Sequence, residues 1–74
     1  MTIQEIKAIQ ISNFLASKGY EPINRKGNKW WYLSPLHTEK TASFKVDLTK
    51  NVWYDFALGK GGNIIDLAMQ LYHT

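Results

Sequence analysis

The chain of 74 residues contains no cysteine, and this absence excludes more kinds of structure than any other feature of its composition. Without cysteine there are no disulfides and none of the thiolate ligands that dominate structural zinc sites. A domain of this size buries only ~60% of the surface that its unfolded chain exposes, so it commonly depends on such cross-links. We therefore expect a single domain stabilised by hydrophobic packing, in keeping with a composition that is 45% hydrophobic and 14% aromatic.

Long apolar segments and catalytic clusters are missing as well. No stretch approaches the roughly 18 apolar residues of a membrane-spanning helix, and no signal-like segment begins the chain. We expect a soluble, cytoplasmic protein with no membrane partner. The chain has no D-x-D motif, no acidic cluster for Mg²⁺, and no Cys or Ser nucleophile arranged beside His37. We expect no catalytic residue and no cofactor, and a small enzyme that uses His37 with Glu39 is the least favoured alternative.

The whole chain has a net charge of +3, and basic and aromatic residues are interleaved through its middle. The bases between residues 22 and 60 are Arg25, Lys26, Lys29, Lys40, Lys45, Lys50 and Lys60, and the aromatics are Trp30, Trp31, Tyr32, Phe44, Trp53, Tyr54 and Phe56. Single-stranded nucleic acid offers phosphates to the first set and base faces to the second. A sheet with an aromatic core and a solvated charged face uses the same residue types. Composition leaves both interpretations open.

The apolar pattern predicts an α+β fold with helices at both ends of the chain. Thr2 and Glu5 form a T-x-x-E capping box, which starts a helix. We expect a break near residues 9–11 and a second short helix, capped by Ser12 or Asn13, that ends before Gly19. A final helix should begin at the N-x-x-D motif of Asn63 and Asp66 and run to about Tyr72.

Between the helices, alternating apolar residues predict a small antiparallel sheet of four or five strands. The expected strands cover residues 20–25, 29–33, 43–48 and 52–56. Three consecutive aromatics in the second strand place at least one large ring away from the core, because successive strand side chains face opposite ways. We expect Lys45 and Trp53 to share the outer face of a hairpin, where a cation beside an indole suits binding.

A glycine cluster, Gly59-Lys60-Gly61-Gly62, leads into the last helix. Backbone N–H groups and the helix dipole would favour a phosphate there, with Lys60 adding charge. The spacing of a P-loop is absent, and a flexible turn is the other interpretation of the same residues.

Two motifs at a fixed separation carry a family resemblance. The sequence S-P-L-H-T-E-K-T-A-S-F runs from Ser34 to Phe44, and W-Y-D-F-A-L-G-K-G-G-N runs from Trp53 to Asn63. Residues 29–71 thereby resemble the N-terminal zinc-ribbon domain of bacterial DNA primases, which reads roughly C-P-x-H-x-E-K-T-P-S-F, then Y-x-C-F-x-C-G-x-G-G-D and an apolar helix. The resemblance implies one zinc-ribbon-like domain, residues 1–74. It would be the N-terminal module of a longer replication protein from a plasmid, phage or mobile element.

The departures from that family fall on its metal ligands. Where the family places Cys, His, Cys and Cys, this chain has Ser34, His37, Asp55 and Leu58. Leu58 has no donor atom and Ser34 is a poor neutral ligand, so too few donors remain for a structural zinc. We expect no bound metal, with Leu36, Leu58 and the Trp side chains holding the domain together in its place.

The resemblance also implies a function, the binding of single-stranded template DNA by a module that is not itself catalytic. The residues expected to contact nucleic acid are Arg25, Lys26, Lys29, Trp30, Lys40, Lys45, Trp53 and Lys60. A catalytic primase domain downstream, or a helicase, would be the protein partner. The alternative function is a protein–protein docking module that binds that catalytic domain or a helicase.

Overall fold

The computed structural model describes residues 2–36 and 42–72. Three helices and five strands follow in the order α1 (Ile3–Lys7), α2 (Ile11–Ser17), β1 (Asn24–Lys26), β2 (Lys29–Tyr32), β3 (Phe44–Asp47), β4 (Val52–Asp55), β5 (Lys60–Gly62) and α3 (Ile64–Tyr72). The expected α+β fold is confirmed. A fifth strand forms where the sequence indicated a glycine turn, and the first strand is shorter than expected because Pro22 cannot donate to the sheet.

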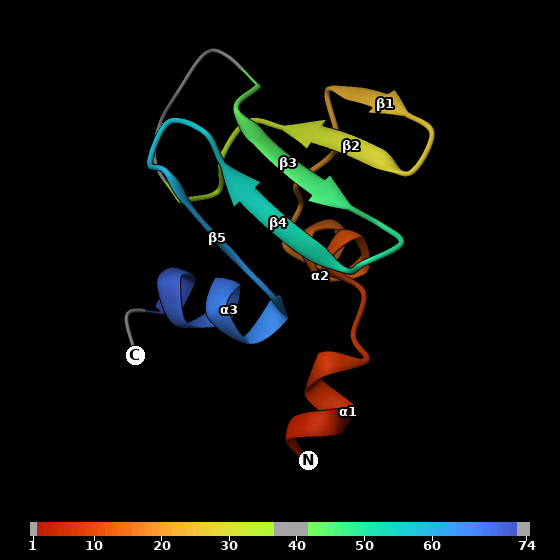
Figure 1. The fold of residues 1–74 in the computed structure, drawn as a ribbon, viewed down its shortest axis with the longest axis vertical. Helices are drawn as coiled ribbons and strands as arrows, with labels where there is room; N and C mark the ends of the chain where they lie inside the picture. The colour runs from red at the N-terminus through yellow and green to blue at the C-terminus, as the bar shows by residue number, and fades with distance from the viewer. Residues whose placement is uncertain (1, 37–41, 73–74) are drawn as a thin grey trace.

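The sheet is an antiparallel meander in which each strand pairs with its neighbour in the sequence (Figure 1). Residues directly opposite each other share a face of the sheet. One row across the sheet is Asn24, Trp31, Lys45, Tyr54 and Gly61, and the next row, on the other face, is Arg25, Trp30, Val46, Trp53 and Gly62. This register decides which aromatic rings face the core.

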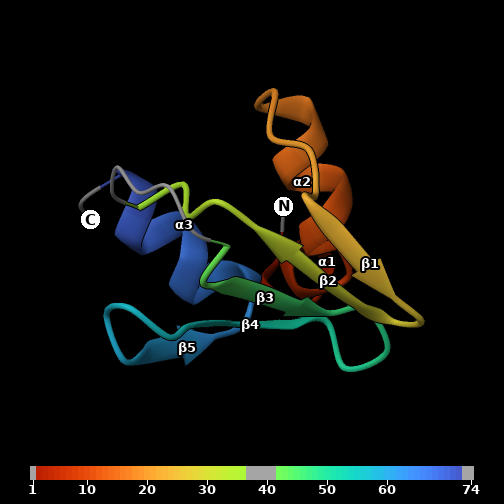
Figure 2. The same cartoon turned by 90° about the horizontal axis from the view of Figure 1, so that it is seen from above.

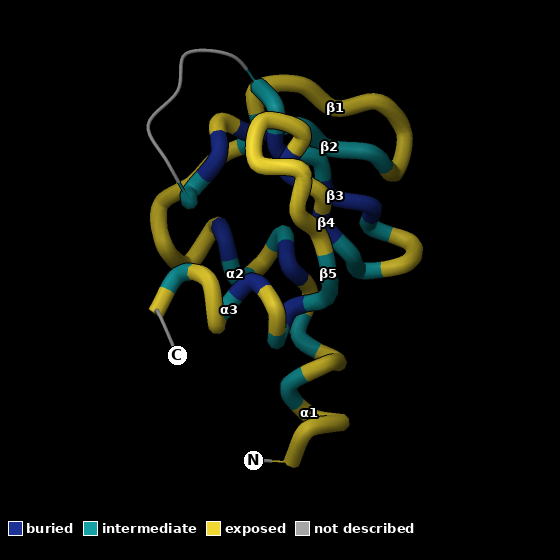
Figure 3. Tube along the Cα trace, turned by 60° about the vertical axis from the view of Figure 1, so that its left-hand side comes forward, coloured by how far each residue is buried: buried dark blue, intermediate teal, exposed yellow. Residues whose placement is uncertain are grey.

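All three helices of the described residues lie on one side of the sheet, and none of them covers the other side (Figure 2). The core forms between α2, α3 and the inner face, where the buried stretches gather in Figure 3. Its buried apolar side chains are Ile11, Leu15, Tyr32, Phe44, Val46, Trp53, Ile64 and Leu67. Phe44 and Trp53 stack at its centre, with ring centroids 5.3 Å apart. We name the helix-free side the outer face.

The helix ends follow the sequence in part. Thr2 and Glu5 form the predicted capping box, and Gly19 has the left-handed backbone (φ 88°) expected after a helix. The chain breaks between α1 and α2 as expected, but α2 starts at Ile11 with Gln10 as its N-cap, so capping by Ser12 or Asn13 is wrong. Gln10 makes no side-chain capping bond.

Asn51, in the turn between β3 and β4, supplies the missing cap from a distant part of the chain. Its side-chain oxygen accepts a hydrogen bond from the Ile11 N–H at 2.9 Å, and its amide nitrogen donates to the Ile9 carbonyl at 2.8 Å. The sheet thereby holds the start of α2 directly. No helix in the described parts of the chain has the length and apolar character needed to cross a bilayer.

Candidate nucleic-acid interface

Three aromatic side chains gather on the outer face, where an antiparallel sheet normally presents polar groups to water. They are Trp31, Tyr54 and Phe56, and we name them the outer aromatic cluster. The Trp31 and Phe56 rings stack with centroids 5.6 Å apart, and Tyr54 meets Phe56 edge to face at 4.8 Å. Tyr54 is 40% exposed and Phe56 is 54% exposed. Apolar rings that gather on an exposed surface are typical of an interaction site.

Lys45 lies within this cluster. It stands between Trp31 and Tyr54 in the same row of the sheet. Its ammonium lies 5.8 Å from the centre of the Trp31 ring and 5.7 Å from that of Phe56, within the range of cation–π attraction. The cluster thus combines ring faces with a positive charge whose position is fixed by two rings.

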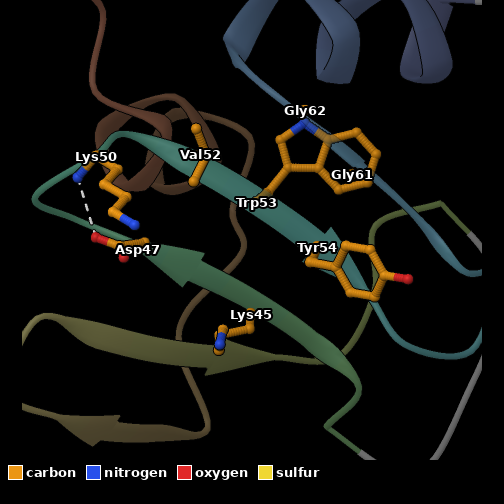
Figure 4. Close-up of a pocket in the computed structure, with 8 residues that line it drawn as sticks. All are labelled: Lys45, Asp47, Lys50, Val52, Trp53, Tyr54, Gly61 and Gly62. Carbon is orange, nitrogen blue, oxygen red and sulfur yellow. Dashed lines mark hydrogen bonds between the residues drawn. The ribbon is translucent and has the colours of Figure 1, made fainter.

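A depression of ≈ 420 Å³ lies on the β4–β5 side of Lys45. Figure 4 shows the residues that line it, which are Lys45, Asp47, Lys50, Val52, Trp53, Tyr54, Gly61 and Gly62. Gly61 is needed here, because a Cβ at this position would lie 2.7 Å from the Tyr54 ring and 2.6 Å from the Trp53 carbonyl oxygen. Glycine therefore lets the Tyr54 ring lie close to the edge strand β5 beside the depression.

An ion pair fixes the far end of the outer face. The Lys29 ammonium contacts the Asp47 carboxylate at 2.8 Å. That bond, together with hydrogen bonds from the Lys50 and Thr49 backbone N–H groups, lowers the pKa of Asp47 from 3.8 to about 2. The predicted contact residue Lys29 thus already has a carboxylate partner. Lys26 lies opposite Lys29, on the same face.

Trp53 does not share the outer face with Lys45, so that expectation is wrong. The β3–β4 register places Trp53 opposite Val46 and Tyr54 opposite Lys45. Trp53 is 3% exposed, and its indole N–H donates to the Asn63 carbonyl at 2.9 Å. Both faces of β4 carry apolar residues, so alternation alone did not show which face is buried. Burial removes Trp53 from the set of rings that a base can reach.

The other predicted contact residues lie apart from the cluster. Arg25 and Trp30 pair on the inner face, with the guanidinium 4.6 Å from the ring centre. Lys60 is exposed on β5, where it lines a second depression on the side of α3. Lys40 lies outside the described residues. Of the seven predicted residues that the structure describes, Lys45 alone lies at the outer aromatic cluster.

Sequence reasoning missed the three rings of the cluster, although one signal for them was present. The run Trp30-Trp31-Tyr32 required an aromatic off the core face, and the structure identifies it as Trp31. The expectation that Trp53 faces outward would have placed Tyr54 and Phe56 on the inner face. The β3–β4 register instead places Tyr54 beside Lys45 on the outer face, where its ring meets Phe56.

The glycine cluster does not present an open helix N-terminus to an anion. Gly61 and Gly62 belong to β5. The start of α3 is capped by its own side chains: Asn63 accepts hydrogen bonds from the Ile65 and Asp66 N–H groups, and Asp66 accepts one from the Asn63 N–H at 2.9 Å. The predicted N-x-x-D start is confirmed. A carboxylate therefore already occupies the position that a phosphate would take.

Two of the four expected ligand positions are joined by a hydrogen bond. Ser34 Oγ donates to Asp55 Oδ2 at 2.6 Å, and both residues are buried. The other Asp55 oxygen accepts from the Ala57 and Leu58 backbone N–H groups at 2.9 and 3.0 Å. Leu58 is 43% exposed, so the expectation that it helps to hold the core together is wrong, while Leu36 does pack against the core.

This donor set does not fit a structural zinc. Among residues 2–36 and 42–72, no group of three His, Cys, Asp or Glu side chains gathers around a common point. Ser34 and Asp55 are engaged with each other, and Leu58 has no donor atom. His37 lies outside the described residues. Tetrahedral zinc requires four N, S or O donors, and structural sites are dominated by thiolates.

The fold and the site define a small ribbon-like α+β domain whose uncovered sheet face carries aromatic rings and a lysine. Comparison with known proteins gives the family. All of residues 1–74 match the CHC2 zinc finger, the zinc-ribbon family of DnaG-type primases, and the chain belongs to this family. It does so without the cysteines from which the family takes its metal ligands.

Individual relatives agree. The chain is 38% identical to a DNA primase of Synechocystis over 71 residues, 95% of this chain, and 38% identical to one of Treponema pallidum over 52 residues, 70% of this chain. It spans about a tenth of the length of these relatives, 11% and 9%. The solved structure of the zinc-binding and RNA polymerase domains of Aquifex aeolicus primase superposes with a TM-score of 0.66 at 27% identity, over 99% of this chain and 18% of that one.

Proposed function

We propose that this domain binds single-stranded DNA across the outer face of its sheet, as the template-binding module of a primase-like replication protein. The observation that supports this most is the placement of Lys45 among the three rings of the outer aromatic cluster, of which Tyr54 and Phe56 are exposed. Rings that stack on unpaired bases, combined with a cation that contacts phosphate, are what non-duplex nucleic acid requires.

The surroundings of the cluster agree with a strand that runs across the sheet. Lys26 and Lys29 lie on the same face towards β1, and Lys50 lines the depression next to β4. Lys29 is already paired with Asp47, so Lys45 and Lys50 supply most of the charge for phosphate. The residues of this chain carry no chemistry in that role; they bind and orient a strand for a catalytic domain elsewhere.

A titration of a fluorescently labelled single strand, followed by anisotropy at increasing salt, tests this function. We expect the affinity to fall as salt rises, because bound lysines displace counterions from phosphates. Phe56→Ala should weaken binding about 5-fold to 150-fold, since one stacked base contributes ~1–3 kcal/mol. Lys45→Ala should weaken binding and also reduce the dependence on salt.

A matched control exists on the helix side. Lys18 lies 5.8 Å from the Phe14 ring and 4.9 Å from the Tyr72 ring, so it is also a lysine beside two aromatics. Lys18→Ala should leave DNA binding unchanged apart from the loss of one charge. Equal effects of Lys18→Ala and Lys45→Ala, or no binding at low salt, would rule out the outer face as the DNA site.

Protein–protein docking is the second candidate function, and the exposed apolar side chains of the helices favour it. Ile3, Met69 and Tyr72 are each about half exposed or more, on α1 and α3. They lie on the helix side, away from the outer aromatic cluster, so the two functions would use different faces. Ile3→Ser should then leave DNA binding intact, and loss of contact with a catalytic domain in the full-length protein would identify docking.

A further inference from the structure

The buried hydrogen bond between Ser34 and Asp55 joins two segments that are far apart in the sequence. Ser34 follows β2, and Asp55 ends β4. In the family pattern these two positions, with those of His37 and Leu58, carry the metal ligands. We propose that the Ser34–Asp55 pair takes over the structural role of the ion, so that this domain holds its fold without a metal. The proposal concerns folding and does not depend on DNA binding.

The geometry is that of a strong hydrogen bond. A hydroxyl that donates to a carboxylate at 2.6 Å lies in the range of charge-assisted bonds. Ser34 Oγ also accepts from the Leu36 N–H at 3.0 Å, so the hydroxyl holds the start of its own loop as well as the distant carboxylate. A serine hydroxyl does both, since it is donor and acceptor at once.

Burial of Asp55 is compensated by these contacts. The residue is 0% exposed, and a carboxylate removed from water destabilises a fold unless hydrogen bonds replace its hydration. Asp55 accepts from Ser34 and from the two backbone N–H groups at positions 57 and 58. No buried side-chain nitrogen or oxygen among the described residues lacks a partner. Ser34, Asp55 and the backbone of the turn that follows β4 thus form one hydrogen-bonded network.

The same pair also fixes the outer aromatic cluster. Phe56 follows Asp55 directly, so an inward Asp55 turns the Phe56 ring outward. The Phe56 N–H donates to the Ser43 carbonyl at 2.8 Å, so the chain after β4 is also hydrogen-bonded to the residue that precedes β3. Loss of the pair would therefore release the residue that stacks on Trp31.

Thermal melts and metal analysis test the proposal on the purified domain. We expect no stoichiometric zinc and the same Tm with and without a chelator. Ser34→Ala should lower the Tm by about 5–10 °C, because it leaves a buried carboxylate oxygen and a backbone N–H without this partner. Ser17→Ala is the matched control: its hydroxyl also donates at 2.6 Å, to the Phe14 carbonyl, but on an exposed helix end. It should change the Tm far less.

A second experiment restores the ligands. The triple variant Ser34→Cys, Asp55→Cys, Leu58→Cys, kept reduced, should bind one Co²⁺ with thiolate charge-transfer absorption and melt at a lower temperature once the metal is chelated. Three results would overturn the proposal: stoichiometric zinc in the unaltered protein, equal losses of Tm in Ser34→Ala and Ser17→Ala, or no cobalt site in the triple variant.

Discussion

The β3–β4 and β4–β5 hairpin turns have the same design and hold different parts of the molecule. Asp47 pairs with Val52 and Asp55 pairs with Lys60, so each turn contains four residues. In each, the aspartate that ends the strand accepts hydrogen bonds from the backbone N–H groups two and three residues later. The fourth turn residue has a left-handed backbone in both, with φ of 54° at Asn51 and 67° at Gly59.

The two turns differ in the contacts of the second aspartate oxygen and of the side chain at the fourth turn position. In the first turn the second Asp47 oxygen binds the Lys29 ammonium, and the Asn51 side chain holds the start of α2. In the second turn the matching oxygen of Asp55 binds the buried Ser34, and glycine leaves no side chain at the fourth position. At positions where the family pattern places metal ligands, the second turn thus has the same aspartate hydrogen bonding as the first.

Asn51→Ala should produce the largest effect among the turn variants that follow. Alanine loses the cap of α2, at about 1 kcal/mol, and a non-glycine residue without a helpful side chain in the left-handed region costs roughly 1–2 kcal/mol more. We expect a loss of about 2–3 kcal/mol in the free energy of unfolding, measured by urea denaturation. Asn51→Gly keeps the backbone freedom and should lose only the cap. If both variants lost the same free energy of unfolding, the left-handed backbone at position 51 would contribute nothing to the effect of alanine.

Gly59→Ala should have a smaller effect, because no atom lies within 4 Å of the added Cβ and only the left-handed backbone opposes it. We expect a loss of about 1–2 kcal/mol in the free energy of unfolding. Gly59→Asn copies the first turn into the second and should cost less than alanine, since asparagine tolerates this region. If asparagine and alanine were equally harmful, the two turns would not be equivalent.

The sequence predicted the local features well. The capping box at Thr2, the left-handed Gly19 and the start of α3 at Asn63 each depend on neighbours within three or four residues, and each is confirmed. The helix–strand–helix order and the antiparallel sheet followed from the same local patterns and from the resemblance to the primase family.

The long-range features were not predictable from one sequence. The sequence contains the D-x-x-x-N and D-x-x-x-G turns, eight residues apart. Which side of β4 is buried, however, depends on the register of β3 against β4 across the first turn. The four-residue turn sets the register that places Trp53 on the inner face and Tyr54 on the outer face. The same register therefore decides which face is the candidate binding surface. The contacts of Ser34 with Asp55 and of Asn51 with Ile11 join residues 21 and 40 positions apart, which no local pattern indicates.

Acid should remove the contribution of the Asp47 carboxylate to stability, and this is the smallest effect we predict. The folded protein lowers the pKa of Asp47 from 3.8 to about 2, chiefly through Lys29. A lowered pKa means that the stabilising charge is fully present above about pH 4 and is lost as the pH falls towards 2. Thermal melts of the unaltered protein and of Asp47→Asn should therefore differ at neutral pH and converge as the pH falls through this window. A difference in Tm that stays constant from pH 7 to pH 2 would show that the Lys29–Asp47 pair does not depend on the carboxylate charge, and that the first turn is held by its backbone hydrogen bonds alone.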